Sequence, residues 1–93
     1  MDMHNERTMA TEQIKAQIFG RQVVVGAKQL RKALSAKKVL CVYLARNADP
    51  AITEPLEDLC QENQVTYAWA KSMQDLGSAC GIEVGAAAAA VLN

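Results

Sequence analysis

The spacing of hydrophobic residues changes along the chain, and these changes predict strands that alternate with helices. Val39 to Ala45 is a near-continuous apolar run of strand length, which is typical of a central strand covered on both faces. Gln22 to Val25 is a shorter β-branched run that ends at Gly26, and it favours a second strand. Val65 to Ala70 has alternating large side chains and predicts a third strand.

Helical spacing occupies the segments before and between these strands. A weak apolar stripe, Ile14 and Ile18, predicts a helix within Thr11 to Phe19. The segment Ala27 to Ser35 has apolar residues at i, i+3 and i+4 starting from Leu30, so it predicts an amphipathic helix. The opposite face of this second helix carries the basic residues Lys28, Arg31 and Lys32.

Two further helices are predicted in the second half of the chain. An apolar stripe over Ile52 to Cys60 indicates a helix that follows a loop at Asn47 to Pro50. We expect Pro55 in the first turn of this helix, where its missing N–H costs nothing. Ser72 stands three residues before Asp75, the spacing of an N-cap and an early acid, so a short helix should follow and end near Gly81.

The C-terminal segment, Gly85 to Leu92, fits two structures. Its alanines favour a helix by propensity, whereas the strand-rich context favours a buried strand against which a helix packs closely. Strands alternating with helices indicate an α/β sandwich around one sheet. With 93 residues the chain is expected to form one domain over residues 12–93, preceded by a flexible tail of residues 1–11.

The formal net charge of zero hides a segregation of charge along the sequence. Between Lys15 and Arg46 there are eight basic residues and no acidic ones. From Asn47 onward there are seven acidic residues, and Lys71 is the one base. A block of one sign suggests a polyanion-binding surface, of which nucleic acid is the commonest ligand. The alternative is that the acidic half folds against the basic half.

Several classes of function lack the residues they need. The cysteines, Cys41, Cys60 and Cys80, have no metal or redox spacing, so we interpret them as buried reduced thiols. His4 is the one histidine, and no thiol or zinc chemistry can be assembled around it. We therefore expect no cofactor, no metal and no enzymatic activity.

Cellular placement is expected from two observations. No apolar run approaches the roughly 18 residues that span a membrane, and the N-terminus lacks the apolar centre of a signal peptide. The protein is therefore expected in the cytoplasm. The strand aromatics Tyr43, Tyr67 and Trp69 favour core packing over base stacking, and the acids of Glu54 to Glu62 favour a solvated helix face.

The segment Gly26 to Lys32 is the sharpest candidate site. A strand ends at a glycine and a helix begins at once, so free N–H groups at the helix start can bind an anion. Lys28 and Lys32 share one helix face, and with Gln29 they could contact phosphates and base edges together. The second glycine and the Lys-Ser/Thr pair of a P-loop are absent. The simpler interpretation is a solvated helix face.

These residues resemble a known family, the kink-turn-binding ribosomal proteins of the L7Ae and L30e type. Gly26 to Lys32 (Gly-Ala-Lys-Gln-Leu-Arg-Lys) resembles their Gly-Thr-Asn-Glu-Thr-Thr-Lys signature, in the Lys-Gln form of small bacterial paralogues. Leu76 to Val84 closely matches their Leu-Gly-x-Ala-Cys-Gly-Ile-Glu-Val run. Ala48 to Pro50 and Cys60 to Tyr67 resemble further family segments in the same order, so the similarity covers about residues 12–92.

The resemblance implies a three-layer α/β/α sandwich with a four-stranded mixed sheet. It also implies recognition of sheared G·A pairs in bent RNA, with Lys28 and Gln29 on guanine edges and Lys32 on a base or phosphate. Asp49 would help to seat the extruded nucleotide or the loop that covers it. The full expected RNA site comprises Gly26, Ala27, Lys28, Gln29, Arg31, Lys32, Asp49, Ala70, Lys71 and Ser72, the last three as a loop over that nucleotide.

We expect additional phosphate contacts from Lys15, Arg21 and Lys37, besides Arg31 and Lys32 of the signature helix. The expected partner is a kink-turn-like RNA, for example ribosomal RNA or a riboswitch, bound by a monomer. The alternative is a protein-interaction module of the same fold that has lost specific RNA binding. In that case the acidic helix, Glu54 to Glu62, would be the binding face.

Overall fold

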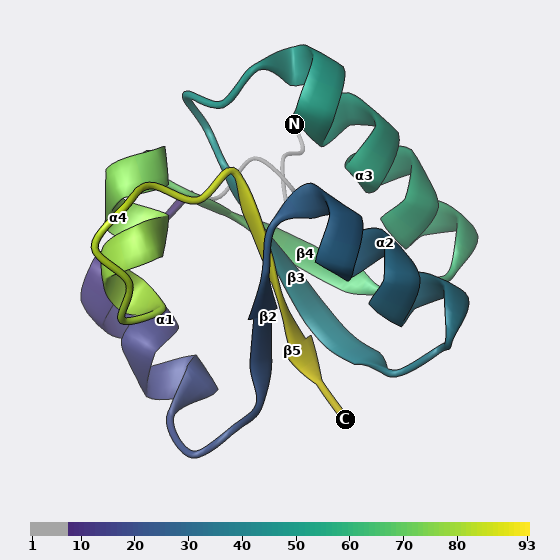
Figure 1. Cartoon of the computed structure of the whole chain (residues 1–93), viewed down its shortest axis with the longest axis horizontal. Helices are drawn as coiled ribbons and strands as arrows, with labels where there is room; N and C mark the ends of the chain where they lie inside the picture. The colour runs from purple at the N-terminus through teal and green to yellow at the C-terminus, as the bar shows by residue number, and fades with distance from the viewer. Residues whose placement is uncertain (1–7) are drawn as a thin grey trace.

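The structure is a computed structural model that describes residues 8–93 as one α/β domain (Figure 1). Its elements in chain order are β1 (Thr8–Met9), α1 (Thr11–Ile18), β2 (Val23–Val25), α2 (Ala27–Ser35), β3 (Val39–Ala45), α3 (Pro50–Glu62), β4 (Thr66–Ala70), α4 (Met73–Ala79) and β5 (Ala88–Leu92). Each strand and helix that was predicted before Gly85 is present within one or two residues of its expected bounds. Among the described residues, no helix is long and apolar enough to cross a membrane.

The sheet has five strands in the order β1-β4-β3-β5-β2, so the expectation of four strands was wrong. The additional strand is β1, in which Thr8 and Met9 pair in parallel with Trp69 and Ala70. Two residues are too short to show an alternating pattern in the sequence. The expected tail of residues 1–11 therefore holds β1 and the start of α1, and residues 1–7 of it, including His4, lie outside the described residues.

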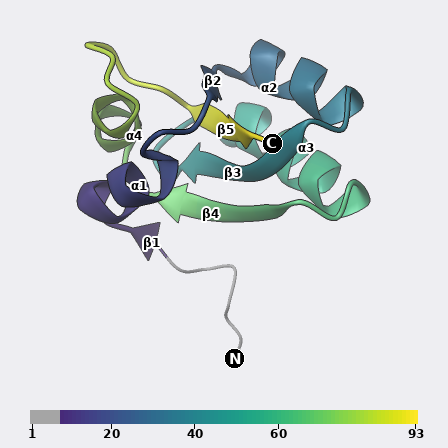
Figure 2. The same ribbon diagram turned by 90° about the horizontal axis from the view of Figure 1, so that it is seen from below.

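The sheet is mixed and covered by helices on both faces, as the α/β/α prediction required (Figures 1 and 2). One face packs against α1 and α4 around Ile14, Tyr43 and Leu76. The other packs against α2 and α3 around Leu30, Val42 and Leu56. Strands β3 and β4 are parallel, whereas β5 runs antiparallel to both β3 and β2.

The alanine-rich C-terminal segment forms strand β5, which resolves its ambiguity in favour of the buried strand. Ala88, Ala89 and Ala90 are fully buried between the two helix layers. Because β5 lies between β3 and β2, its side chains face helices on both sides, and small groups allow close packing. Tertiary burial therefore outweighs the helix propensity of alanine here.

Helix α3 begins earlier than expected, which changes the place of its two prolines. Pro50 occupies the first helical position, and the Asp49 side chain caps the helix by accepting a hydrogen bond from the Ala51 N–H at 3.0 Å. Pro55 consequently lies inside the helix, so the expectation that it lies in the first turn was wrong. The sequence contained both prolines, and the cap at Asp49 decides which one starts the helix.

Candidate nucleic-acid interface

The ends of three strands bring most of the predicted site residues together at one rim of the sheet. We call this the carboxyl rim: residues 26–29 after β2, residues 46–49 after β3, residues 71–73 after β4 and the adjoining segment 81–87 before β5. Backbone hydrogen bonds join these segments, from Gly26 N–H to Ala88 C=O at 2.9 Å and from Arg46 N–H to Ala70 C=O at 3.0 Å. Helices α2, α3 and α4 all begin at this rim.

Gly26 turns the chain from β2 into α2. Its φ of 105° and ψ of 148° lie in a region that is essentially restricted to glycine. An added Cβ would meet nothing within 4 Å, so the requirement for glycine comes from the backbone conformation and not from crowding. The Gly26 carbonyl accepts the first helical hydrogen bond, from the Leu30 N–H at 3.0 Å. This turn leads directly into α2.

The start of α2 is open to an anion. No side chain caps it, whereas Asp49 caps α3 and Ser72 caps α4. The first N–H groups of an uncapped helix, together with its dipole of roughly half a positive charge, attract negative groups. Ala27 is half-buried at the helix start, beside Gly26.

The signature side chains on α2 point away from the core. Leu30 and Leu34 are buried against the sheet, which leaves Lys28, Gln29, Arg31 and Lys32 exposed. Within the described part of the chain, none of these four makes an ion pair or a side-chain hydrogen bond. A cluster of three cations and one amide is therefore presented at and just behind the helix start, without an internal partner to displace.

Two of the predicted site residues use their side chains within the protein. The Asp49 carboxylate caps α3, and the Ser72 hydroxyl caps α4 by accepting from the Asp75 N–H at 3.0 Å. Ala70 is fully buried, so its side chain cannot touch RNA. In the predicted loop, Lys71 alone is exposed with a free cationic side chain among the described residues.

Asn47 holds two of the rim segments together. Its side-chain oxygen accepts a hydrogen bond from the Met73 N–H at 2.8 Å, which ties the segment after β3 to the start of α4. Arg46 stands beside it, with its guanidinium 5.1 Å from the centre of the Trp69 ring and a hydrogen bond from Nε to the Thr8 hydroxyl. These contacts fix the shape of the rim on the side away from α2.

The segment between α4 and β5 adds exposed apolar side chains that the sequence analysis did not assign to the site. Ile82 is 36% exposed and Val84 is 69% exposed, on a segment that leads into β5 beside Gly26. Two backbone hydrogen bonds hold this segment on α4, from Ile82 N–H to Gly77 C=O and from Ala86 N–H to Met73 C=O, both 3.0 Å. The signal available in the sequence was a pair of branched residues between Gly81 and Gly85.

Two of the expected phosphate contacts do not belong to this rim. Arg21 precedes β2, and Lys37 follows α2, so both lie at the opposite rim of the sheet. Lys15 is on α1 and pairs with Glu12 at 3.9 Å. Since strand β3, with seven residues, spans roughly 20 Å, Arg21 and Lys37 cannot share one compact ligand with Lys28. The continuous basic block of the sequence is therefore divided in space.

The cysteines are buried or half-buried, as expected of structural thiols. Cys60 is fully buried, and burial, with a smaller effect of the Glu57 carboxylate, raises its pKa to about 11. Burial also raises the pKa of Cys41 and Cys80, which are half-buried. The described residues contain no cluster of ligands that could hold a metal ion.

The aromatic and acidic residues behave mostly as predicted. Tyr43 is buried in the core, while Tyr67 and Trp69 are half-buried and pack edge to face at 6.5 Å. Glu57 departs from the expected solvated face, because it is half-buried and accepts a hydrogen bond from the Tyr67 hydroxyl at 3.1 Å. Tyr67, Trp69 and Glu57 pack on the α3 side of the sheet, whereas Tyr43 packs on the side covered by α1 and α4.

Comparison with known proteins gives consistent matches. The model of the ribosomal protein L7Ae/L30e/S12e/Gadd45 family matches residues 9–93. An RNA-binding protein of Bacillus pumilus is 44% identical over 72 residues, which cover 77% of this chain and 88% of that protein. The RNA-binding protein YbxF of Geobacillus stearothermophilus is 39% identical over the same shares of the two chains.

A solved structure extends the similarity to three dimensions. The 15.5kD RNA binding protein of Giardia lamblia superimposes with a TM-score of 0.78 and 26% identity. The superposition covers 89% of this chain and 70% of that one.

Proposed function

The chain belongs to the ribosomal protein L7Ae/L30e/S12e/Gadd45 family, and from this premise we propose that it is an RNA-binding protein whose target is a kink-turn or a similar bent internal loop. The observation that carries the proposal is the uncapped start of α2, where Lys28, Gln29 and Lys32 are exposed without internal partners. The target RNA is ribosomal RNA or a regulatory element of a transcript. We expect no chemical step.

Each part of α2 makes a different kind of contact with the RNA. The free N–H groups of its first turn neutralise phosphate charge where two RNA segments bend toward each other, and the Lys28 ammonium donates to a guanine edge. The Gln29 amide both donates and accepts hydrogen bonds, so it can pair with the donor and acceptor groups on guanine edges of sheared G·A pairs. Lys32, one turn behind, contacts the next phosphate or base.

The segment 81–87 completes the proposed interface. Ile82 and Val84 offer exposed apolar surface along α4, on the segment that leads into β5, and an unstacked base can pack against it. Because Ser72 and Ala70 are committed to the cap and the core, this segment is a better support for an extruded nucleotide than the loop predicted from the sequence. Lys71 remains available for a phosphate at the far side.

Binding should act by population shift. Free RNA samples extended and kinked forms, and a protein that fits the kinked form alone increases its population. The deformation of the RNA then contributes to specificity, because only sequences that form sheared pairs kink at low cost. The protein needs no motion of its own for this mechanism.

The test is a fluorescence titration of two RNA duplexes that differ in the G·A pairs alone. One has an intact kink-turn, and in the other the sheared pairs are replaced by Watson–Crick pairs. The proposal requires at least about thirtyfold tighter binding of the intact duplex, since two mismatched recognition positions cost about 1–3 kcal/mol each. Equal affinity for the two duplexes would show that α2 provides general phosphate binding only.

A further inference from the structure

The rim opposite the start of α2 carries a second cluster of cations. We call it the amino rim: residues 19–22 before β2, residues 36–38 between α2 and β3 with the first two residues of β3, residues 63–65 between α3 and β4, and the end of β5 at residues 92 and 93 (Figure 2). Its cations are Arg21, Lys37 and Lys38, all exposed. Within the described residues none of them makes an ion pair or a side-chain hydrogen bond.

Strand β5 holds these cations at a fixed separation. The Leu92 N–H donates to the Gln22 carbonyl, and the Asn93 N–H donates to the Lys38 carbonyl, both at 2.9 Å. Since β2 and β3 lie on either side of β5, the two basic turns are separated by two strand spacings, or roughly 10 Å. A short segment of a single nucleic-acid strand can reach both turns.

The same rim exposes two large apolar side chains. Phe19 is 87% exposed in the turn after α1, and Leu40 is 47% exposed at an irregularity in β3. Phe19 is next to Gly20 and two residues before Arg21, so an aromatic face and a guanidinium share one turn. An exposed ring beside cations is the combination on which unpaired bases stack while their phosphates are neutralised.

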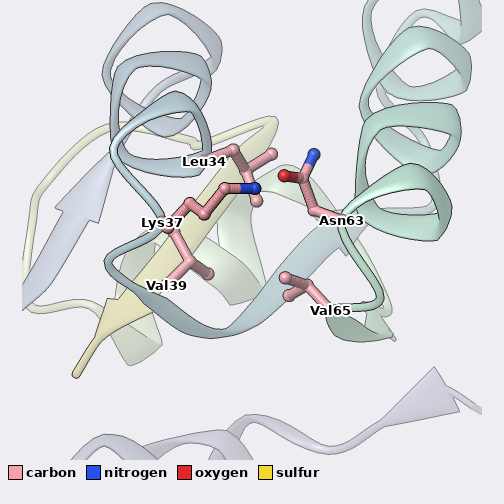
Figure 3. Close-up of a pocket in the computed structure, with 5 residues that line it drawn as sticks. All are labelled: Leu34, Lys37, Val39, Asn63 and Val65. Carbon is pink, nitrogen blue, oxygen red and sulfur yellow. The ribbon is translucent and has the colours of Figure 1, made fainter.

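Lys37 adopts an uncommon backbone conformation at this rim. Its φ of 57° lies in the left-handed region, at a position after the helix end where glycine is the ordinary residue. Its side chain reaches over a shallow pocket of about 100 Å³ that is lined by Leu34, Val39, Asn63 and Val65. Figure 3 shows the Lys37 ammonium and the Asn63 amide oxygen directed toward each other across this pocket. A cation and an amide therefore stand at the mouth of an apolar hollow.

Negative charge is sparse on this side of the molecule. Among the described residues, Glu62 at the end of α3 is the nearest acid in sequence to the pocket, next to Asn63. The three cations outnumber it, so the local potential attracts a polyanion. The acids Glu54 and Asp58 lie one or more turns back along α3, toward the other rim.

We propose that the amino rim is a second RNA-contact surface, which binds a short single-stranded segment through phosphate contacts to Arg21, Lys37 and Lys38 and through stacking of a base on Phe19. This inference rests on the proposed function, because the segment would belong to the RNA that α2 holds. A duplex fits less well, since its base faces are already covered by stacking. The two rims are roughly 20 Å apart, so an RNA extended beyond the kink can reach both.

The experiment uses three RNAs: the short kink-turn duplex, the same duplex with a single-stranded oligo(A) extension, and free oligo(A). The extension should tighten binding by the natural protein about tenfold, because the second contact becomes intramolecular. The double variant Arg21→Gln/Lys37→Gly should lose this gain and should bind free oligo(A) about tenfold less tightly. Phe19→Ala should weaken oligo(A) binding about fivefold or more.

The choice of glycine at position 37 separates binding from folding. Glycine adopts a φ of 57° without strain, so the variant should fold at least as stably as the natural protein. Gln64 also has a φ of 57° and is not one of the proposed contacts, which are Phe19, Arg21, Lys37 and Lys38. Gln64→Gly is therefore the matched control that relaxes the backbone without removing a charge. This control should bind all three RNAs as the natural protein does.

The outcomes distinguish this proposal from the proposed function. If the short duplex requires intact G·A pairs but the extension adds nothing, the second surface is wrong while the function stands. If the short duplex shows no preference for G·A pairs, the function fails, and free oligo(A) still decides the second surface. Binding of oligo(A) that is equal in the natural protein and the double variant would overturn the proposal, and a protein partner for this rim would then be sought.

Discussion

Gly77 of α4 lies directly against the carbonyl oxygen of Val84: a Cβ on Gly77 would stand 2.0 Å from that oxygen. No Cβ atom can approach an oxygen so closely, so a side chain at this position must displace the segment that carries Ile82 and Val84. The contact explains the glycine within the Leu76 to Val84 motif. It also couples the packing of α4 to the shape of the carboxyl rim.

Gly77→Ala should therefore lower both stability and RNA affinity. Because the contact involves backbone on one side, relief requires a backbone shift, and we expect a loss of about 1–3 kcal/mol in the free energy of unfolding. Urea denaturation and titration of a kink-turn duplex measure the two effects. Ser78→Ala, at the exposed neighbouring position on the same helix, is the control. If Gly77→Ala retained the stability and RNA affinity of the natural protein, the contact between Gly77 and Val84 would not hold the rim in shape.

Gly26→Ala should damage the RNA site through backbone strain. The φ of 105° at Gly26 is costly for alanine, by about 1–3 kcal/mol, although the space for a Cβ is empty. Gly20→Ala is a matched control, because Gly20 also has a positive φ, 74°, and open space, but lies at the amino rim. Both variants should lose stability, and Gly26→Ala alone should weaken binding of the short kink-turn duplex. If Gly26→Ala bound the short kink-turn duplex as tightly as Gly20→Ala does, the turn at Gly26 would have no part in RNA binding.

Gln29→Ala should reduce discrimination between RNAs more than general affinity. Loss of the amide should cost about 1–3 kcal/mol on the intact kink-turn, because the base-edge hydrogen bonds are lost. It should change little on the duplex without G·A pairs. Gln22→Ala, an exposed glutamine at the other rim, should leave both affinities unchanged. If Gln29→Ala weakened binding to both duplexes equally, Gln29 would be a phosphate contact and not a base reader.

The buried thiol of Cys60 predicts a loss of stability at alkaline pH. Its folded-state pKa of about 11 lies above that of an exposed thiol, near 9. The unfolded chain therefore releases the thiol proton first, and the free energy of unfolding should fall as the pH rises from about 9 to 11. In Cys60→Ala, which is destabilised at every pH by the cavity, the decline over this range should be shallower. If chemical denaturation showed the same fall in the free energy of unfolding for Cys60→Ala and for the natural protein, ionisation of the Cys60 thiol would not be its cause.

The spacing of hydrophobic residues was sufficient to predict most helices and strands, because each of them buries a face in the core. The apolar runs of β3 and α2 keep one period throughout, and the structure gives both segments their predicted bounds. Strand β1 was missed because two residues, Thr8 and Met9, form it by pairing with distant residues of β4. The misplaced Pro55 has a similar cause, since the cap at Asp49, and not the proline itself, starts α3.

The sequence was sufficient to predict site residues that are neighbours in the chain. It was not sufficient for residues that the fold brings together or separates. Lys28 and Gln29 lie on one helix turn, so their common exposure follows from the period of α2. Arg21 and Lys37 belong to the same basic block but end at the opposite rim, because β2 and α2 each cross the domain. Val84 was not among the predicted site residues, and only the fold shows that it is exposed.

Recognition of the kinked form should be visible directly as the bending of a kink-turn RNA on addition of the protein. A duplex that carries a fluorescence donor and acceptor at its two ends reports the kink as a rise in energy transfer. We expect a saturable rise with the natural protein in buffer without Mg²⁺, and no rise with the duplex that lacks G·A pairs. Tight binding without a change in energy transfer would contradict recognition of the kinked form.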